Sequence, residues 1–297
     1  MNSNINFSLF ALLICVGVLF SSCEDVIDVD LDEGTPQLNV DAFLNNLNTE
    51  KRIRLQMTAP YFDNSAKNYV EDATVSIADD MGGQWNFTYD KDGFYVMEDT
   101  AGFIRNGYTY TLFIKRSAGD FVATSTCMAT IPVDSIRYED LSEDGGGFGD
   151  EEGYFAEFYA TDIVGEENFY WIKHYRNGAY SNAAGDINIS ADGGAGEDTD
   201  GFTFIPPIRF AINDFEEAYE LGEKIRLEIH SINEATYEFL SQVQVQMTNG
   251  GLFADPPYNV TTNVENISGS KEPADLAVGW FSVSMVKDFE SIVEDPE

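Results

Sequence analysis

The chain has 297 residues, of which 52 are acidic and 16 are basic, and its formal net charge at pH 7 is -36. A charge of this sign and size argues against nucleic acid as a partner, because phosphates would be repelled, and against lying flat on an anionic leaflet; it favours cationic partners, including metal ions. Hydrophobic residues make up 43% of the chain and aromatic residues 13%, which is typical of a folded protein and not of a disordered one.

The N-terminal segment has the composition of a signal peptide. Residues 7–20 form an uncharged apolar run, which falls short of the roughly 20 residues that span a bilayer. Ser21 and Ser22 then precede Cys23, and small residues followed by Cys resemble a bacterial lipobox, in which the thiol receives a diacylglycerol. We therefore predict that residues 1–22 are removed and that the protein is attached to the lipid bilayer through Cys23. An ordinary secretory signal cleaved near Ser22 is the alternative.

An acidic run follows the cysteine directly, beginning with Glu24 and Asp25. A short acidic run at this place looks like the signal that sends lipoproteins of the Bacteroidetes phylum to the cell surface. The same charges would also make residues 23–36 a solvated, flexible tether, and both roles can hold together. The expected location is the outer membrane, with the lipid-anchored protein facing the cell exterior.

Residues 37–135 are predicted to form a β-sandwich domain. Ile53, Leu55 and Met57 alternate with polar residues, which is the period of a half-buried strand. Similar runs recur along the segment and are separated by turns such as Asp90–Gly93. About six or seven short strands in about 100 residues are typical of an immunoglobulin-like sandwich.

A second domain, mostly β, is predicted over residues 154–297, after an acidic, glycine-rich linker at 136–153 that could not build a core. Strand-like alternation continues in this half and includes residues 208–212, after a pair of prolines. One helix is expected near 232–249, because Ser231 and Glu234 fit a capping box and apolar residues follow at helical spacing. The expected fold class is therefore mainly β, with an N-terminal immunoglobulin-like β-sandwich and a C-terminal mostly-β domain carrying one helix.

Short motifs in a fixed order connect the mature chain with a known family. In chain order they are Leu38–Leu44, Ala73–Ile77, Asp92–Tyr95, Tyr108–Leu112, Tyr237–Leu240, Pro256–Val260 and Val278–Val283. Together with the lipoprotein signal, this pattern resembles the Bacteroidetes surface lipoprotein family catalogued as a domain of unknown function, commonly encoded beside TonB-dependent receptors. The resemblance implies a location and an outer-membrane β-barrel as partner, and it carries no catalytic residue.

Acidic loops are the first candidates for a binding site. Asp192, Glu197, Asp198 and Asp200 lie among glycines at 192–201, and Ca²⁺ prefers such oxygen ligands. Their spacing matches no known calcium loop, so a solvated surface loop is favoured there. The same interpretation is favoured even more for the acidic glycine loop at 142–153. We assign no metal site and no cofactor.

A dense aromatic stretch is a further candidate for a binding surface. Phe169, Tyr170, Trp171, Tyr175 and Tyr180 form a dense aromatic stretch, and aromatic platforms stack on sugars or anchor interfaces. Strand alternation, however, sends about half of such a stretch into a core.

Motifs for covalent chemistry are missing from the sequence. Cys127 is the one cysteine left after lipidation and processing, and we expect it to be a small buried hydrophobe. No G-x-S-x-G, H-E-x-x-H or phosphate-loop motif occurs, so we assign no catalytic residue and expect no enzyme.

The expected function is a non-enzymatic accessory subunit of an outer-membrane transport machine. A TonB-dependent receptor is the expected partner, as the resemblance implies, and the role would be substrate capture or handover. The first alternative is a free-standing surface module that binds glycans or mediates adhesion. The second alternative is a hydrolase whose paired carboxylates do not stand out among the 52 acidic residues.

Overall fold

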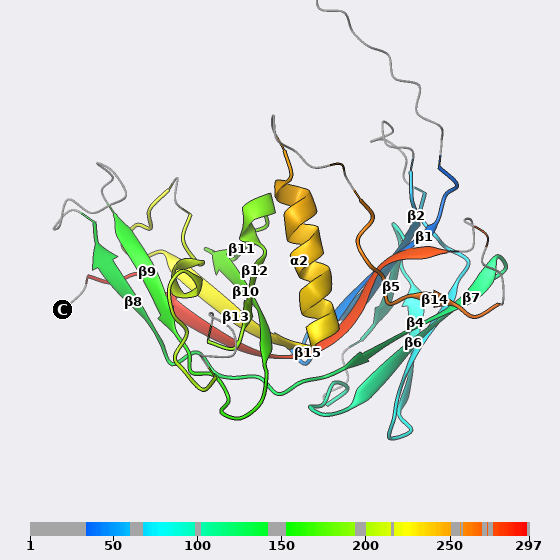
Figure 1. Cartoon of the computed structure of the whole chain (residues 1–297), viewed down its shortest axis with the longest axis horizontal. Coiled ribbons are helices and arrows are strands. Elements are labelled where there is room, and N and C mark those ends of the chain that lie inside the picture. The colour runs from blue at the N-terminus through cyan, green and yellow to red at the C-terminus, as the bar shows by residue number, and fades with distance from the viewer. Residues whose placement is uncertain are drawn as a thin grey trace, which may run out of the picture. The chain divides into compact units, whose positions relative to one another are not determined.

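A computed structural model of the chain describes residues 34–59, 68–98, 102–141, 153–193, 200–214, 217–250, 256, 258–268, 272 and 276–295. Cys23, Glu24 and Asp25 lie outside the described residues, so the predicted lipid site and export signal stay predictions. Residues Thr35–Glu297 form one compact unit, separate from Met1–Gly34. The described part of this unit is mainly β and carries a single α-helix, α2 (Figure 1), which confirms the predicted fold class.

The N-terminal half contains a run of short strands, each of which buries alternate side chains. In β2 the side chains of Ile53 and Leu55 are fully buried, and in β6 those of Tyr110, Leu112 and Ile114 are fully buried. These residues belong to one hydrophobic cluster, as period-2 alternation requires. The strands are β1 (Leu38–Asn45), β2 (Lys51–Met57), β3 (Thr74–Asp79), β4 (Gln84–Tyr89), β5 (Phe94–Met97), β6 (Thr109–Arg116) and β7 (Gly119–Thr126).

The C-terminal half adds further strands and the helix. The 3-10 turn η3 occupies residues 208–210, where the sequence pattern predicted a strand, so that part of the prediction was wrong. The elements are β8 (Ser135–Asp140), β9 (Tyr154–Tyr159), β10 (Phe169–Arg176), β11 (Ala179–Tyr180), η1 (Ala184–Asp186), β12 (Asn188–Ala191), η3 (Ile208–Phe210), β13 (Lys224–Ile232), α2 (Glu234–Thr248), β14 (Glu265–Asn266) and β15 (Ala277–Ile292).

The long strand β15 connects the two halves through one sheet. Its first half pairs in parallel with β1, and its second half pairs antiparallel with β13, so the strand order runs β11-β10-β13-β15-β1-β2-β5-β4-β3-β6-β7-β14. The two predicted domain segments, 37–135 and 154–297, therefore share hydrogen-bonded strands. The strand β8 lies almost entirely in the segment predicted as a linker and pairs with β9.

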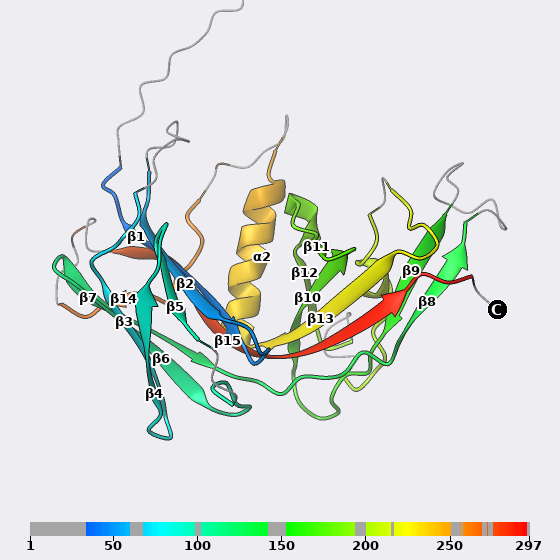
Figure 2. The same ribbon diagram turned by 180° about the vertical axis from the view of Figure 1, so that it is seen from behind.

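The helix α2 covers one face of the sheet where β15 passes from β1 to β13 (Figures 1 and 2). Trp280 of β15 stacks on Phe239 of α2, with 4.6 Å between ring centroids, and its indole N–H donates to Thr236 Oγ1 at 3.0 Å. On the opposite face of β15, Phe281 and Val283 lie in the core of the N-terminal half. None of the helical segments in the described part of the chain is long and apolar enough to cross a bilayer.

The start of α2 corrects one sequence prediction. Ser231 was expected to cap the helix, but it lies inside β13, fully buried and paired with Met285. The cap is Asn233, whose side-chain oxygen accepts the backbone N–H of Thr236 at 2.9 Å. The strand pairing extends through Ser231 and so places the first free helical amide two residues later.

Candidate functional site

A polar pocket of about 440 Å³ lies at the β11 edge of the sheet. It opens between the β10–β12 hairpin region, which carries η1, and the segment that follows η3. Pockets of this size suit small-molecule ligands. The lining residues are His174, Ser181, Ala183, Gly185, Asp186, Asn188, Ala211, Asn213 and Asp214.

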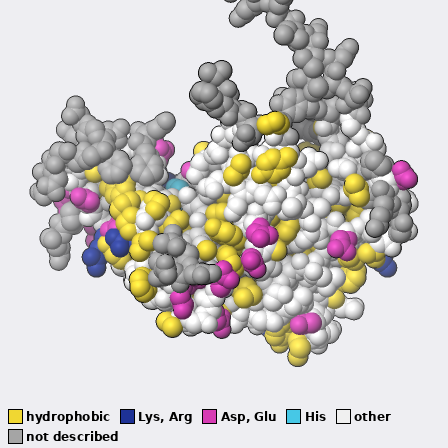
Figure 3. Space-filling view, viewed as in Figure 1, with side chains coloured by type: hydrophobic (Ala, Val, Ile, Leu, Met, Phe, Trp, Pro, Cys, Tyr) yellow, Lys and Arg dark blue, Asp and Glu magenta, His cyan; other side chains and the backbone are white. Residues whose placement is uncertain are grey.

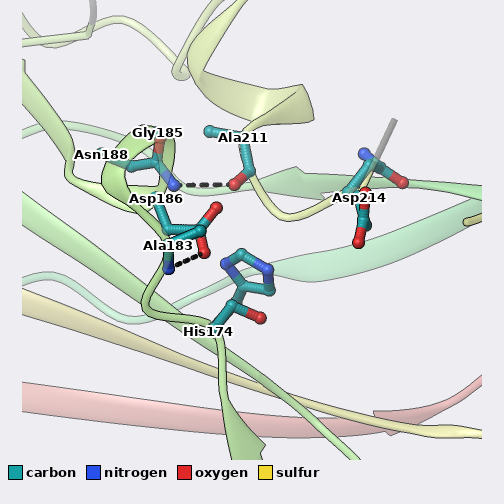
Figure 4. A pocket seen from close by; sticks show the side chains of 9 residues that line it. His174, Ala183, Gly185, Asp186, Asn188, Ala211 and Asp214 are labelled. Atoms are coloured by element: carbon teal, nitrogen blue, oxygen red, sulfur yellow. Dashed lines mark hydrogen bonds between the residues drawn. The ribbon is translucent and has the colours of Figure 1, made fainter. Parts of the chain in front are cut away.

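His174 lies at the buried side of this pocket. It occupies an even position of β10, so its side chain leaves the sheet on the same face as the fully buried Tyr170 and Ile172. Only 4% of His174 is exposed, and neither ring nitrogen makes a hydrogen bond to another described residue. The ring points into the space between Asp186 and Asp214 (Figure 4). The ring nitrogens of His174 are not among the fully buried polar atoms that lack a partner, so they reach the open space of the pocket and are available to a ligand.

The charged side chains that act on His174 within the described part of the chain are acidic. Burial lowers the pKa of His174 below its usual value, while the carboxylates of Asp186 and Asp214 oppose that shift. The imidazole is therefore neutral at pH 7. Asp186 is half-buried and Asp214 is exposed, so the two carboxylates lie at different depths. The described residues that line the pocket include no Lys or Arg.

Hydrogen bonds within the walls hold the pocket in shape. Asn188 Nδ2 donates to the Ala211 carbonyl at 2.8 Å and so ties β12 to the segment after η3 (Figure 4). Asn213 Nδ2 donates to the Ala156 carbonyl at 2.7 Å. The backbone N–H of Ala183 donates to Asp186 Oδ2 at 2.7 Å and fixes that carboxylate. Both side-chain amides thus hold the walls together, and the Asp186 carboxylate keeps further acceptor capacity for a ligand.

The opposite face of β10 carries a cluster of aromatic and charged side chains. Lys173 Nζ lies 3.6 Å from the ring centroid of Trp171 and 5.7 Å from that of Tyr180. The guanidinium carbon of Arg226 lies 4.6 Å from the ring centroid of Tyr175. Burial lowers the pKa of Lys173 to about 8, and the carboxylate of Asp41 opposes that shift. We call Trp171, Lys173, Tyr175 and Tyr180 the aromatic–lysine cluster.

The residues of the sequence match a described family over most of the chain. Residues 24–290 fit the model of the family described as "Domain of unknown function (DUF4249)". The chain belongs to the DUF4249 family. No curated protein matches it significantly.

Among solved structures, the DUF4249 chain is similar to the FN1–FN3 domains of chicken CNTN1 at 11% identity and a TM-score of 0.24. That alignment covers 68% of this chain and 62% of the other, so the DUF4249 chain spans less than two thirds of the length of that structure.

The five aromatic residues identified in the DUF4249 sequence lie in different environments. Tyr170 is fully buried and donates to Asp162 Oδ1 at 2.6 Å, and Phe169 packs on Tyr237 of α2 with centroids 5.1 Å apart. Trp171 is half-buried. Only Tyr180 of the five is classed as exposed, at 37%.

The acidic loop at 192–201 is described only at its ends, and Glu197 and Asp198 lie outside the described residues. Asp192 Oδ1 accepts the backbone N–H of Asn168 at 2.8 Å, and Asp200 accepts that of Gly165 at 2.8 Å. Both carboxylates thus fix backbone turns. Across the described part of the chain, no group of three or more His, Cys, Asp or Glu side chains could hold a metal ion.

Cys127 lies in the hydrophobic core of the N-terminal half and not among the described residues of the pocket. Cys127 is fully buried, and burial raises the pKa of its thiol to about 12, which keeps the sulfur a thiol at neutral pH.

The pocket at His174 was not found from the sequence, because Asp186 and Asp214 carry no recognisable motif. The one available signal was that His174 is one of only two histidines.

Proposed function

We propose that this DUF4249 protein is a lipid-anchored outer-membrane protein of the cell exterior and a non-enzymatic accessory subunit of an outer-membrane transport machine. Its role would be to capture or hand over a substrate for a β-barrel partner such as a TonB-dependent receptor. The lipobox-like junction at Cys23 supports the anchor, and the acidic run from Glu24 supports surface export. The family resemblance supports the receptor.

The observation that carries the capture role is the polar pocket at His174. Its walls are tied together by side-chain amides, so the ligand does not have to order them on binding. Preorganised pockets with a few placed polar groups are typical of small-molecule sites. An accessory subunit that presents a substrate to a transporter needs such a site.

Affinity purification from detergent-solubilised outer membrane tests the proposal, with the tag at the C-terminus, the other end of the chain from Cys23. We expect stoichiometric recovery of a large outer-membrane β-barrel with the wild-type protein. Recovery of the protein alone, across several mild detergents and growth conditions, would refute the accessory role.

The lipid anchor has its own test. Labelled palmitate should enter the wild-type protein and not Cys23→Ala, because the thiol is the attachment atom. Equal labelling of the two proteins contradicts an anchor at Cys23.

The aromatic–lysine cluster favours a second candidate function, a free-standing glycan-binding module. Tyr175 and Tyr180 lie with ring centroids 5.2 Å apart, and Tyr180 is partly open to solvent. Rings of this kind stack on sugar faces. A glycan array with the wild-type protein and Tyr180→Ala separates the functions: binding that is lost in the variant, without any co-purified β-barrel, would favour the glycan module.

A further inference from the structure

We propose that the pocket at His174 binds a small organic cation, such as a ligand carrying a protonated primary amine. This inference rests on the proposed function, because it names the substrate class of the site to which we assign capture. Three features of the pocket support it: the acidic side chains of its lining, the acceptor capacity of Asp186 and the buried imidazole of His174.

The charge of the pocket lining favours a cationic ligand. Among the described lining residues the charged side chains are Asp186 and Asp214, and both act electrostatically on His174. The imidazole itself is neutral at pH 7 for the reason given above, so the lining carries a net negative charge. An anionic ligand would meet only repulsion there. A neutral ligand would take water away from Asp186 without offsetting its charge, which is unfavourable.

Free hydrogen-bonding groups point to the same class of ligand. Asn213 donates two side-chain hydrogen bonds to backbone carbonyls of the walls, and Asn188 donates one. Asp186 accepts one bond, from the Ala183 N–H, which leaves capacity on its carboxylate. A ligand that brings donors can use this capacity. An ammonium group brings three donors and a positive charge, and charge-assisted bonds to carboxylates are the strong ones.

The buried imidazole is the independent observation at this site. His174 is more than nine-tenths buried, has no hydrogen-bond partner for its ring among the described residues and points into the pocket (Figure 4). A neutral imidazole offers one acceptor nitrogen. That nitrogen and the Asp186 carboxylate can both accept from one ammonium group, with Asp214 at the exposed side adding attraction.

The overall charge of the protein also favours cation binding. In the face shown in Figure 3, acidic side chains appear across the surface, and basic side chains show only near its margins. With a net charge of -36, the whole protein attracts small cations. This general attraction also sets the main control in the test, since it produces weak binding everywhere.

The test is a binding titration of the full chain, purified in mild detergent, with three five-carbon probes of different charge. The probes are cadaverine, the neutral 1,5-pentanediol and the anionic glutarate, each followed by NMR or calorimetry in 0.15 M NaCl. We expect saturable one-to-one binding of cadaverine and none of the other two. Asp186→Asn and Asp214→Asn should each weaken cadaverine binding about tenfold, the loss expected for one charge-assisted bond.

A matched control separates the pocket from the overall charge. Glu238→Gln removes one charge from the exposed side of α2 and should leave the affinity within about twofold. Equal loss in Glu238→Gln and Asp186→Asn would overturn the proposal, as would binding of 1,5-pentanediol as tight as that of cadaverine, or no saturable cadaverine binding. These outcomes leave the β-barrel co-purification untouched, so failure of the ligand class and failure of the accessory role are distinguishable.

Discussion

Replacement of Gly279 by alanine should weaken the pairing of β1 with β15, which connects the two halves of the sheet. Gly279 lies in β15 opposite Val40 of β1, and its φ is +92°, a conformation that L side chains rarely adopt. A Cβ added there would lie 2.6 Å from Asn39 Oδ1 and 2.8 Å from the Val40 carbonyl carbon, and closer still to the Val40 oxygen. Because the obstacle is backbone, it cannot rotate away, and β1 and β15 must separate.

Gly279→Ala should lower the free energy of unfolding through two separate effects. The positive φ contributes about 1–2 kcal/mol for any residue with a Cβ. Displacing the strands by several tenths of an ångström weakens the flanking ladder hydrogen bonds, each worth about 1 kcal/mol and more when the groups stay buried. The sum is about 3–5 kcal/mol, a large share of the roughly 5–15 kcal/mol that stabilises a domain.

Gly107→Ala is the matched control. Gly107 also has a positive φ, +79°, but an added Cβ would meet nothing within 4 Å. It should cost only the backbone part, about 1–2 kcal/mol. Urea unfolding of the full chain, followed by tryptophan fluorescence, measures both free energies. If the two variants differ by less than about 1 kcal/mol, then β1 and β15 do not approach as closely as described, and the argument fails.

Three further predictions concern the cap, the thiol and the pH dependence. Asn233→Ala should lower the free energy of unfolding by about 1 kcal/mol and Asn233→Ser by much less, because Ser also caps; equal losses in urea would contradict the cap. Cys127 should fail to react with a thiol reagent at pH 8 until the protein unfolds, since burial raises its pKa to about 12; fast labelling of the native protein would be the contrary result. Burial lowers the pKa values of His174 and His230 in the folded state, so below about pH 6.5 the unfolded chain binds more protons and stability falls with falling pH. His174→Gln should flatten that fall between pH 7 and pH 5.5, and an unchanged slope in the variant would refute the assignment.

Much of the fold was predictable from local pattern. Strands such as β2 and β6 show the alternation of their buried side chains directly in the sequence, and the glycine-containing turns mark their ends. The parallel pairing of β1 with β15 was not predictable, because it joins segments more than two hundred residues apart and leaves no local signal. The cap at Asn233 was missed because the register of β13 against β15, and not helix propensity, decides where α2 begins.

The pocket at His174 could not be predicted from the sequence for a different reason. His174, Asp186 and Asp214 come from β10, η1 and the segment after η3, and each is unremarkable in its own stretch of sequence. Their meeting depends on tertiary contacts such as the bond from Asn188 to the Ala211 carbonyl. The aromatic stretch did stand out in the sequence, but alternation and the packing of α2 turned Tyr170 and Phe169 inward.

The position of β15 in the chain has a consequence for biogenesis. It is the last of the described strands in sequence order, and it is the partner of both β1 and β13. Until residues 277–292 have been synthesised, β1 and β13 each present an unpaired edge, and the sheet cannot close. Pairings of such long sequence separation also form slowly. The sheet therefore closes late in folding, and until it does the edges of β1 and β13 are open to pairing with other chains.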